Sequence, residues 1–191
     1  MKTVGFAICG SYCTFKEVFK EIEALKKSDY DIIPIMSENA YSLDTRFGSA
    51  ESWRKRFTEI TGNEIIHTIP QAEPIGPKKL LDALIIAPST GNTLAKLATG
   101  VTDTAVTLAA KAHLRNARPV IIAPSTNDAL ANAAKNIGAL LNYKNIYFVP
   151  FGHDSYQTKP TSLVADFTKI APALKAALDG KQLQPTVTEP K

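Results

Sequence analysis

The hexapeptide Ile-Ile-Ala-Pro-Ser-Thr occurs twice in this chain of 191 residues, at Ile85–Thr90 and again at Ile121–Thr126. The distance between the two copies is about the length of one β-strand with its crossover helix. Proline ends the apolar run of each copy, because it has no backbone N–H to donate to a sheet. The repeat therefore predicts two parallel strands of one sheet that end in the same way.

Apolar runs without polar alternation, typical of strands buried on both faces of a sheet, recur along the chain. The expected strands are Thr3–Ile8, Asp31–Met36, Ile65–Ile69, Ala83–Ala87, Val120–Ala123 and Ile146–Val149. Apolar residues at helical spacing predict helices between them. The expected helices are one that follows a Thr14–Glu17 capping box, then Ala50–Thr61, Thr93–Ala98, Asp103–Asn116, Asp128–Leu141 and Leu163–Leu178. This alternation predicts an α/β protein with a three-layer α/β/α Rossmann-like fold and a six-stranded parallel sheet.

Composition is that of an ordinary globular protein, with 45% hydrophobic and 21% charged residues. No linker divides the chain, so we expect a single domain over residues 1–179 and a loose tail over residues 180–191. No apolar run approaches the roughly 20 residues that span a bilayer, and the first residues are typical of a strand and not of a signal peptide. We therefore expect a cytoplasmic protein without a membrane partner.

The net charge of +4 comes from basic residues that are scattered along the chain. Because they form no stripe and have no interleaved aromatic residues, they favour small anions over nucleic acid as partners. Cys9 and Cys13 are the two cysteines, and their spacing matches neither a redox pair nor a zinc site. We expect both cysteines to be structural and no metal to be bound.

Small hydroxyl and amide residues follow the expected strands. Gly10 and Ser11 follow the first strand, Ser37 follows the second, and Ser89–Thr93 and Ser125–Asp128 follow the two hexapeptide strands. Ligands of open parallel sheets bind at the carboxyl ends of the strands, and the amino ends of the helices that start there favour phosphate. Ordinary helix capping would explain any one of these segments. Together they predict one anion-binding crevice.

The glycines limit which cofactor such a crevice could take. The dinucleotide fingerprint G-x-G-x-x-G is absent, since Gly10 stands alone in the first turn, and the sequence has no P-loop. A nicotinamide dinucleotide is therefore not expected in this chain. A mononucleotide such as FMN fits better, with Ser11 and Ser37 as ligands of its phosphate.

The Gly-Ser turn after the first strand, the Pro-Ser-Thr-Gly-Asn-Thr loop and the Ala-Pro-Ser-Thr-Asn-Asp loop resemble segments of a known family. This is the flavoprotein family of flavin-dependent cysteine decarboxylases and flavin prenyltransferases, and the resemblance covers about residues 1–150. It implies a homo-oligomer, either a trimer or an assembly of trimers. It also implies that Asn127 holds a substrate carboxylate and that FMN is bound by Gly10, Ser11, Ser37, Ser89, Thr90, Asn92 and Thr93.

Six segments together are similar to one branch of this family, the B subunits of the dipicolinate synthases of endospore-forming bacteria. They are Thr45–Gly48, Ala72–Lys78, Pro88–Ala98, Arg115–Val120, Ser125–Leu130 and Val149–Asp154. The resemblance implies an NAD(P)-linked oxidation of a CH–CH group during sporulation, from dihydrodipicolinate to dipicolinate, together with an A subunit that supplies NADP. A flavin-dependent decarboxylase and a non-catalytic partner subunit that retains the fold are the alternatives.

The cysteine decarboxylases of the family carry a catalytic histidine at the position that is Pro74 in this chain, which speaks against decarboxylation. His153, on the loop after the last expected strand, is the best histidine for acid–base work, and Asn127 is the second candidate catalytic residue. Two separated cations would recognise a small dicarboxylate substrate. Arg46 and Lys159 are the preferred pair, because both extend from loops at the carboxyl edge of the expected sheet.

Overall fold

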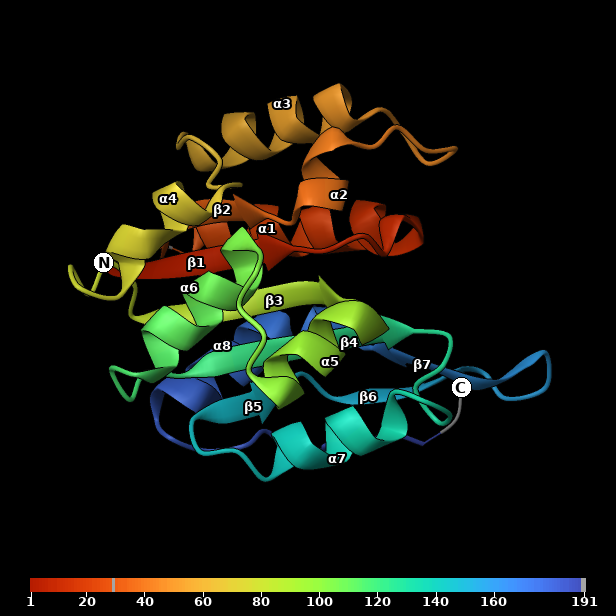
Figure 1. The fold of residues 1–191 in the computed structure, drawn as a ribbon. Helices are drawn as coiled ribbons and strands as arrows, with labels where there is room; N and C mark the ends of the chain where they lie inside the picture. The colour runs from red at the N-terminus through yellow and green to blue at the C-terminus, as the bar shows by residue number, and fades with distance from the viewer. Residues whose placement is uncertain (29, 190–191) are drawn as a thin grey trace.

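The computed structural model describes residues 1–28 and 30–189, and its centre is a seven-stranded sheet (Figure 1). The strands are β1 (Lys2–Ile8), β2 (Tyr30–Met36), β3 (Ala83–Ser89), β4 (Val120–Thr126), β5 (Ile146–Phe148), β6 (Phe151–Ser155) and β7 (Lys159–Ala165). Their order across the sheet is β2-β1-β3-β4-β7-β6, and β5 also pairs with β4. The strands β1 to β5 run parallel, whereas β7 is antiparallel to both β4 and β6.

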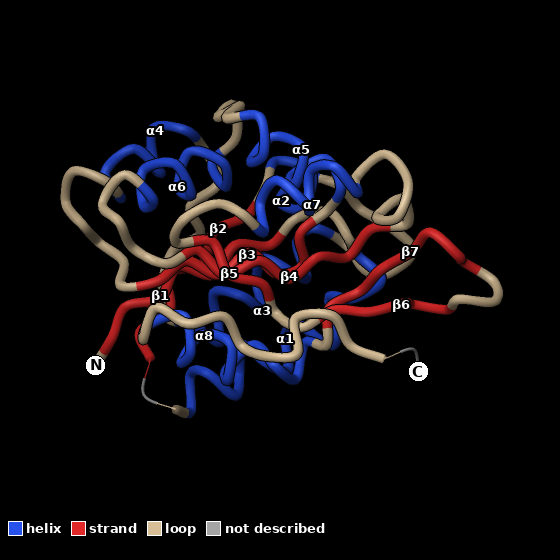
Figure 2. Tube along the Cα trace, turned by 90° about the horizontal axis from the view of Figure 1, so that it is seen from below, coloured by secondary structure: helices blue, strands red, loops and turns tan. Residues whose placement is uncertain are grey.

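Helices cover both faces of this sheet, as the view along its edge shows (Figure 2). One layer holds α1 (Phe15–Lys27), α3 (Ala50–Thr61) and α8 (Ile170–Leu178). The other layer holds α4 (Ile69–Ala72), α5 (Gly91–Thr99), α6 (Ala105–Leu114) and α7 (Ala134–Leu141), and the short α2 (Glu38–Ser42) follows β2. The expected three-layer α/β/α architecture is confirmed.

The central strands are apolar because helices cover both of their faces. All residues of β3 are buried. Within the hexapeptides, Ile85 and Ile86 lie beside Ile121 and Ile122 in parallel register. The two copies are therefore neighbouring strands that end at the same edge of the sheet, as the repeat predicts.

The sheet differs from the predicted six parallel strands where it reaches β4. β5 covers β4 only along Val120–Ile122. The last part of β4, at Ser125 and Thr126, pairs instead with β7 of the β6–β7 hairpin. The sheet thus has five parallel strands and an antiparallel hairpin, and the hairpin stands beside the carboxyl ends of the parallel strands.

Two expected helices are shorter than predicted. The first residues of the expected helix Leu163–Leu178 belong to β7, and α8 begins only at Ile170. The expected helix from Asp128 begins at Ala134, because the intervening residues form a series of turns. Leu163 and Ala165 are buried in β7, and Ala129 and Ala133 are buried in the turns, whereas Leu130 is exposed.

Two smaller predictions are wrong. Ile65–Ile69 forms no strand and contributes one isolated bridge, between Ile66 and Ile35. Thr14 does not cap α1 with its side chain, because its hydroxyl donates to the Ser11 carbonyl oxygen at 2.9 Å. The turn after β1 is therefore closed by its own hydrogen bond.

Residues 181–188, which we expected to form a loose tail, are held against β5 and β6. The side-chain amide of Gln182 bonds to the backbone N–H and carbonyl of Phe148, at 2.7 and 2.8 Å. The Phe151 N–H donates to the Thr186 carbonyl at 3.0 Å, and the Phe151 carbonyl accepts from the Thr188 N–H at 2.9 Å. The tail thereby adds a short parallel pairing to the outer edge of β6.

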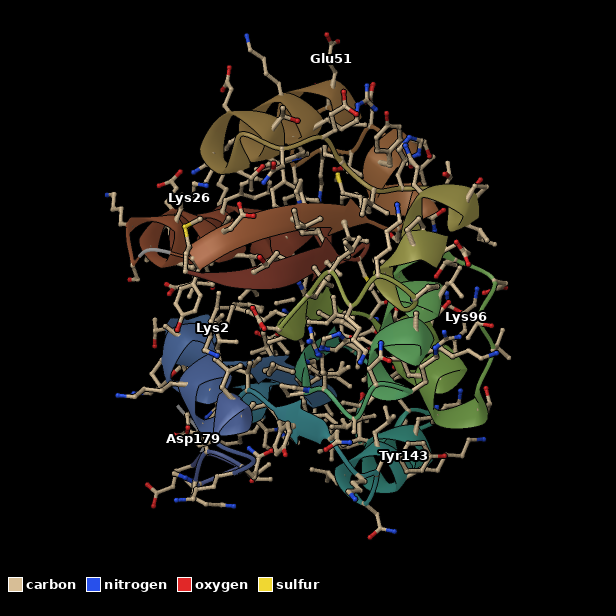
Figure 3. All side chains as sticks on the ribbon, turned by 90° about the vertical axis from the view of Figure 1, so that its left-hand side faces the viewer. Lys2, Lys26, Glu51, Lys96, Tyr143 and Asp179 are labelled. Atoms are coloured by element: carbon tan, nitrogen blue, oxygen red, sulfur yellow. The ribbon has the colours of Figure 1, made fainter. Side chains whose placement is uncertain are left out.

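Charged side chains are spread over the surface. Lys26, Glu51, Lys96 and Asp179 lie on or directly after four different helices (Figure 3). Across residues 1–28 and 30–189, no helix is both long enough and apolar enough to cross a membrane.

Candidate functional site

A cavity of about 1150 Å³ lies at the carboxyl edge of the sheet, among the ends of β1 and β4, the β6–β7 hairpin and α1. This volume is slightly above the usual range of small-molecule pockets, about 300–1,000 Å³. The polar residues that line it from the strand ends and the hairpin are Gly10, Ser11, Thr90, Ser125, Thr126, Asn127, His153, Asp154 and Lys159. The structure thus brings together residues from four separate parts of the sequence.

Two hydroxyl groups in this cavity bridge the ends of β1 and β4. Ser11 Oγ and Ser125 Oγ lie 2.8 Å apart and share a hydrogen bond. Ser125 is almost fully buried, whereas Ser11 is half-buried. The bond fixes the turn after β1 against the second hexapeptide and leaves the other face of Ser11 toward the cavity.

A second contact joins the loops that follow the two hexapeptides. Thr126 Oγ1 donates to Asp128 Oδ1 at 2.6 Å. A Cβ atom at Gly91 would lie 2.8 Å from each of these two oxygens, so only glycine allows the loops to approach so closely. The Asp128 carboxylate is therefore placed against the amino end of α5, where a negative charge is stabilised by the helix dipole.

Asn127 lies between these two residues and has an exposed side chain in the cavity. Its backbone carbonyl accepts a hydrogen bond from Thr161 Oγ1 at 2.7 Å. Its side-chain amide makes no hydrogen bond to any residue that the structure describes. The backbone of Asn127 is thus held in place while its amide is free to bond a ligand.

The β6–β7 hairpin brings an ion pair and a histidine to the cavity. Lys159 Nζ lies 2.7 Å from Asp154 Oδ2, and the Ser162 hydroxyl donates to the same carboxylate oxygen at 3.4 Å. The hydrogen bond to Asp154 raises the pKa of Lys159, so its ammonium stays charged. The buried Nδ1 of His153 has no hydrogen-bond partner within the part of the chain that the structure describes.

The cavity carries more negative than positive charge. Four carboxylates and two ammonium groups line it, and these are Glu17, Glu21, Asp154, Asp166, Lys20 and Lys159. Burial, and the neighbouring Asp166 carboxylate, raise the pKa of Glu21. An anionic ligand would therefore need the hydroxyls, the free amide and the Lys159 ammonium at the strand ends, away from Glu21.

Four of the expected cofactor-binding residues do not line the cavity. Ser37 caps α2 by accepting from the Ala40 N–H at 3.3 Å. Thr93 is buried, and its hydroxyl donates to the sulfur of Cys9 at 3.3 Å. Ser89 is buried at the end of β3, and Asn92 is exposed on α5.

Arg46, expected to bind substrate, lies on an exposed turn, Thr45–Gly48, outside the lining of the cavity. Its guanidinium stacks on the ring of Phe47, 4.9 Å from the ring centroid. Phe47 itself lines the cavity. Arg46 is therefore close to the mouth of the cavity and could reach a ligand only by leaving this ring.

Tyr12 follows Ser11, one of the two serines that were expected to hold the FMN phosphate, and its side chain reaches α2. Its ring packs over Gly10, 3.4 Å from the position of a Cβ atom there, and its hydroxyl donates to the Asn39 carbonyl at 2.7 Å. The ring thus spans from the turn that carries Ser11 to α2, which Ser37 caps. The side chains present at this edge do not fit a phosphate held by these two serines.

The remaining histidines and the buried cysteine have structural surroundings. Burial lowers the pKa of His113 to about 4, and its Nε2 lies 3.1 Å from the Pro119 carbonyl oxygen. Burial raises the pKa of the Cys9 thiol to about 11, which removes it as a nucleophile at neutral pH. His67 stacks on Tyr41, with ring centroids 3.6 Å apart.

Sequence reasoning missed Tyr12, Glu21 and Asp128. Glu17 and Glu21 lie four residues apart in α1, a spacing that places both on one side of a helix. Tyr12 and Asp128 lie within the loops that were singled out, so their positions were a usable signal. Their contacts depend on which segments meet at the sheet edge.

The same architecture occurs in known proteins, and the resemblance inferred from the motifs is confirmed. The B subunit of dipicolinate synthase from Bacillus subtilis (strain 168) is 44% identical over 188 residues, which cover 98% of this chain and 94% of the relative. The crystal structure of the dipicolinate synthase B subunit from Bacillus halodurans matches with a TM-score of 0.91 and 43% identity, covering 100% of this chain and 97% of that one.

A more distant structure shares the fold alone. The FMN-dependent cysteine decarboxylase SpaF matches with a TM-score of 0.67 at 22% identity, over 93% of this chain and 97% of that one. The family model described as "Flavoprotein" matches residues 1–171, which is most of the chain. With that match and these relatives, the chain belongs to the flavoprotein family.

Proposed function

We propose that this chain is the B subunit of a dipicolinate synthase and acts with an A subunit to oxidise dihydrodipicolinate to dipicolinate, pyridine-2,6-dicarboxylate. The observation that carries the proposal is the 44% identity to such a B subunit over 98% of the chain. The cavity at the carboxyl edge, with its free amide and its ammonium group, supports the binding of a small dicarboxylate. The A subunit supplies NADP, because this chain has no dinucleotide fingerprint.

The reaction removes a hydride and a proton from the dihydropyridine ring and transfers the hydride to NADP⁺. Formation of the aromatic ring favours the products, so the protein mainly has to orient the substrate. In the proposed roles, Asn127 bonds one carboxylate, Lys159 attracts the other, and Arg46 assists at the mouth of the cavity. His153 accepts the proton in this proposal, because it lines the cavity and its buried Nδ1 has no hydrogen-bond partner within the described chain.

Flavin has weaker support from the residues than from the family. FMN, when bound, would accept or relay a hydride. The cavity is large enough for it, and Gly10, Ser11 and Thr90 line the cavity, but Ser37 does not line it and Tyr12 bonds to α2, which Ser37 caps. Ser11 and Ser37 thus do not form the FMN phosphate site that the sequence predicts. For this reason no step of the proposed reaction passes through flavin.

A non-catalytic role beside the A subunit is the second candidate. It is favoured by the excess of carboxylates in the cavity, which opposes the binding of a dianion. The two roles differ in what a cavity substitution does. A catalytic subunit loses turnover when a ligand-bonding amide is removed, and a purely structural partner does not.

Reconstitution tests the proposal. The isolated chain with NADP should form little dipicolinate above the slow spontaneous oxidation, and addition of the A subunit should restore the ultraviolet absorbance of the aromatic product. In the reconstituted pair, Asn127→Ala should lower the rate about tenfold or more, because a hydrogen bond to a charged group contributes about 1.5–3 kcal/mol. Asn132→Ala is the matched control, since Asn132 is exposed and does not line the cavity.

Each result has a distinct meaning. Full NADP-linked turnover by the isolated chain would contradict the proposed division between the subunits. An Asn127→Ala pair as fast as the wild type would favour the structural role. Arg46→Ala should chiefly raise the KM if this arginine binds the ground state and the transition state alike.

We also propose a homo-oligomer built from trimers, which the mass of the purified chain in solution tests.

A further inference from the structure

We propose that this chain selects against a phosphorylated flavin. Two places at the sheet edge could hold the phosphate of a flavin mononucleotide, and Asp128 blocks the amino end of α5 while Tyr12 blocks the turn after β1. The inference concerns a cofactor and not the turnover of dihydrodipicolinate. A binding experiment on the isolated chain can therefore fail without affecting the proposed function, and the reverse also holds.

Asp128 brings a negative charge to the amino end of α5, the helix end that would attract a phosphate. Its Oδ1 lies 2.8 Å from the position of a Cβ atom at Gly91, the first residue of α5. The carboxylate is fixed there by the 2.6 Å hydrogen bond from Thr126 Oγ1. A helix amino end that already has a carboxylate beside it no longer favours a second anion, and a phosphate dianion would be repelled.

The hydroxyls of the same helix end are also engaged within the protein. Thr90 Oγ1 accepts from the Thr93 N–H at 3.3 Å and lies 3.2 Å from Thr93 Oγ1. The Thr93 hydroxyl in turn donates to Cys9 Sγ at 3.3 Å. A phosphate at this position would have to replace internal hydrogen bonds as well as overcome the Asp128 charge.

Tyr12 opposes a phosphate independently of Asp128, because its ring fills space beside Gly10. Its ring lies over Gly10, packs against Phe15 with ring centroids 5.1 Å apart, and is fixed at its far end by the hydrogen bond to Asn39. The ring therefore connects the turn that carries Ser11 with α2, which Ser37 caps. A phosphate group bridging these two segments would have to displace the ring and break its hydrogen bond.

The experiment compares FMN with riboflavin, which carries the same ring system and ribityl chain without the phosphate. Flavin fluorescence is titrated with the purified full chain. The wild type should bind FMN no more tightly than riboflavin. Asp128→Asn keeps the shape and a hydrogen-bond acceptor but removes the charge, and it should raise FMN affinity about tenfold or more while leaving riboflavin affinity unchanged. Adding Tyr12→Ala to this variant should raise FMN affinity further.

A matched control removes a carboxylate elsewhere. Asp103→Asn changes the net charge equally, but Asp103 is exposed, pairs with Lys96 and lies beyond the carboxyl end of α5 instead of beside its amino end. It should leave both affinities unchanged. A wild type that binds FMN at least tenfold more tightly than riboflavin would overturn the proposal, and so would an Asp128→Asn chain with no gain in FMN affinity. The wild-type comparison needs no substitution, so it decides the matter even if a variant fails to fold.

Discussion

The two hexapeptides have one sequence and neighbouring places in the sheet, yet their ends have different surroundings. In the first copy, Ser89 is fully buried, and its hydroxyl has no hydrogen-bond partner within residues 1–28 and 30–189. The next residue, Thr90, caps α5 through the N–H of Thr93. The first copy thus ends as a strand followed at once by a helix.

In the second copy the corresponding residues bond to other segments. Ser125 shares a hydrogen bond with Ser11, and Thr126 donates to the Asp128 carboxylate. No helix follows directly, because turns continue as far as α7. The second copy therefore contributes two residues to the cavity, whereas the first contributes only Thr90.

The difference lies outside the repeated residues. The first copy is a central strand with parallel neighbours on both sides, whereas the end of the second pairs with the antiparallel hairpin. Gly91 and the residues after it continue as a helix, and Asn127 with Asp128 forms a turn. Identical sequence thus becomes a helix start in one place and a wall of the cavity in the other, according to its partners.

The largest effect that we expect on this pair concerns His113, which joins the starts of the two strands. The Pro119 carbonyl, just before β4, accepts from the Leu84 N–H at 3.0 Å and lies 3.1 Å from His113 Nε2. Burial is the main cause that lowers the pKa of His113 from 6.5 to about 4. The hydrogen bond to the Pro119 carbonyl opposes this shift, Arg118 lowers the pKa further, and Asp82 raises it.

The sign of the pH dependence follows from this pKa. Between about pH 6.5 and 4 the unfolded chain binds a proton at His113 that the folded chain does not, so the free energy of unfolding falls as the pH falls. The loss amounts to about 3 kcal/mol. Glutamine cannot take up this proton, so the stability advantage of the wild type over His113→Gln should shrink by about that amount from pH 7 to pH 4.

Urea unfolding across this pH range measures the difference. His67→Gln is the matched control, because burial and Arg54 lower the pKa of His67 in the same direction but less. Its difference from the wild type should narrow only slightly. Parallel stability curves for the wild type and His113→Gln would show that His113 is not held neutral in the folded chain.

A smaller effect is expected where the two loops meet at Gly91. Helix propensity alone predicts that Gly91→Ala stabilises the chain by up to about 1 kcal/mol. The new Cβ would, however, lie 2.8 Å from both Thr126 Oγ1 and Asp128 Oδ1, closer than real contacts allow. We expect net destabilisation of about 1–3 kcal/mol, measured as a lower urea midpoint.

The corresponding residue of the second copy provides the control. Asn127 follows Thr126 as Gly91 follows Thr90, and it is exposed. Asn127→Ala should change the free energy of unfolding by less than about 0.5 kcal/mol. A Gly91→Ala chain more stable than the wild type would mean that the loops separate easily and that the contact between them is weak.

The sequence predicts the central part of this comparison well. The apolar runs at Thr3–Ile8, Ala83–Ala87 and Val120–Ala123 are buried on both faces, so their strand character is visible without any tertiary information. The hydroxyl residues after the two prolines lie at one edge of the sheet, as predicted, but the prolines do not end the strands, because β3 continues to Ser89 and β4 to Thr126. The sequence therefore predicts the location of the cavity, at the carboxyl ends of the parallel strands.

The hairpin and the contacts of the cavity could not be predicted in this way. Leu163 and Ala165 are buried in β7, but Leu163 also lies four residues before the buried Phe167, a spacing that fits a helix. What decides for a strand is the free edge of β4 beyond Ile122, a tertiary feature. The bond from Tyr12 to Asn39 likewise joins residues that meet only because β1 and β2 are neighbours.

The smallest effect compares the serines of the two copies directly. Ser89→Ala removes a buried hydroxyl without a partner in the described chain, so it should leave stability unchanged or raise it by up to about 1 kcal/mol. Ser125→Ala removes the partner of Ser11 and should lower stability by about 0.5–1.5 kcal/mol. Urea unfolding of both variants, with Ser11→Ala and the double variant Ser11→Ala/Ser125→Ala, measures the coupling. If the two single changes at Ser89 and Ser125 had the same sign and size, the hydroxyls would have equivalent surroundings. Opposite signs of the two changes in unfolding free energy would show that the same serine of the hexapeptide has different effects in the two strands. The Ser89 hydroxyl would destabilise the first strand, and the Ser125 hydroxyl would stabilise the contact between two loops.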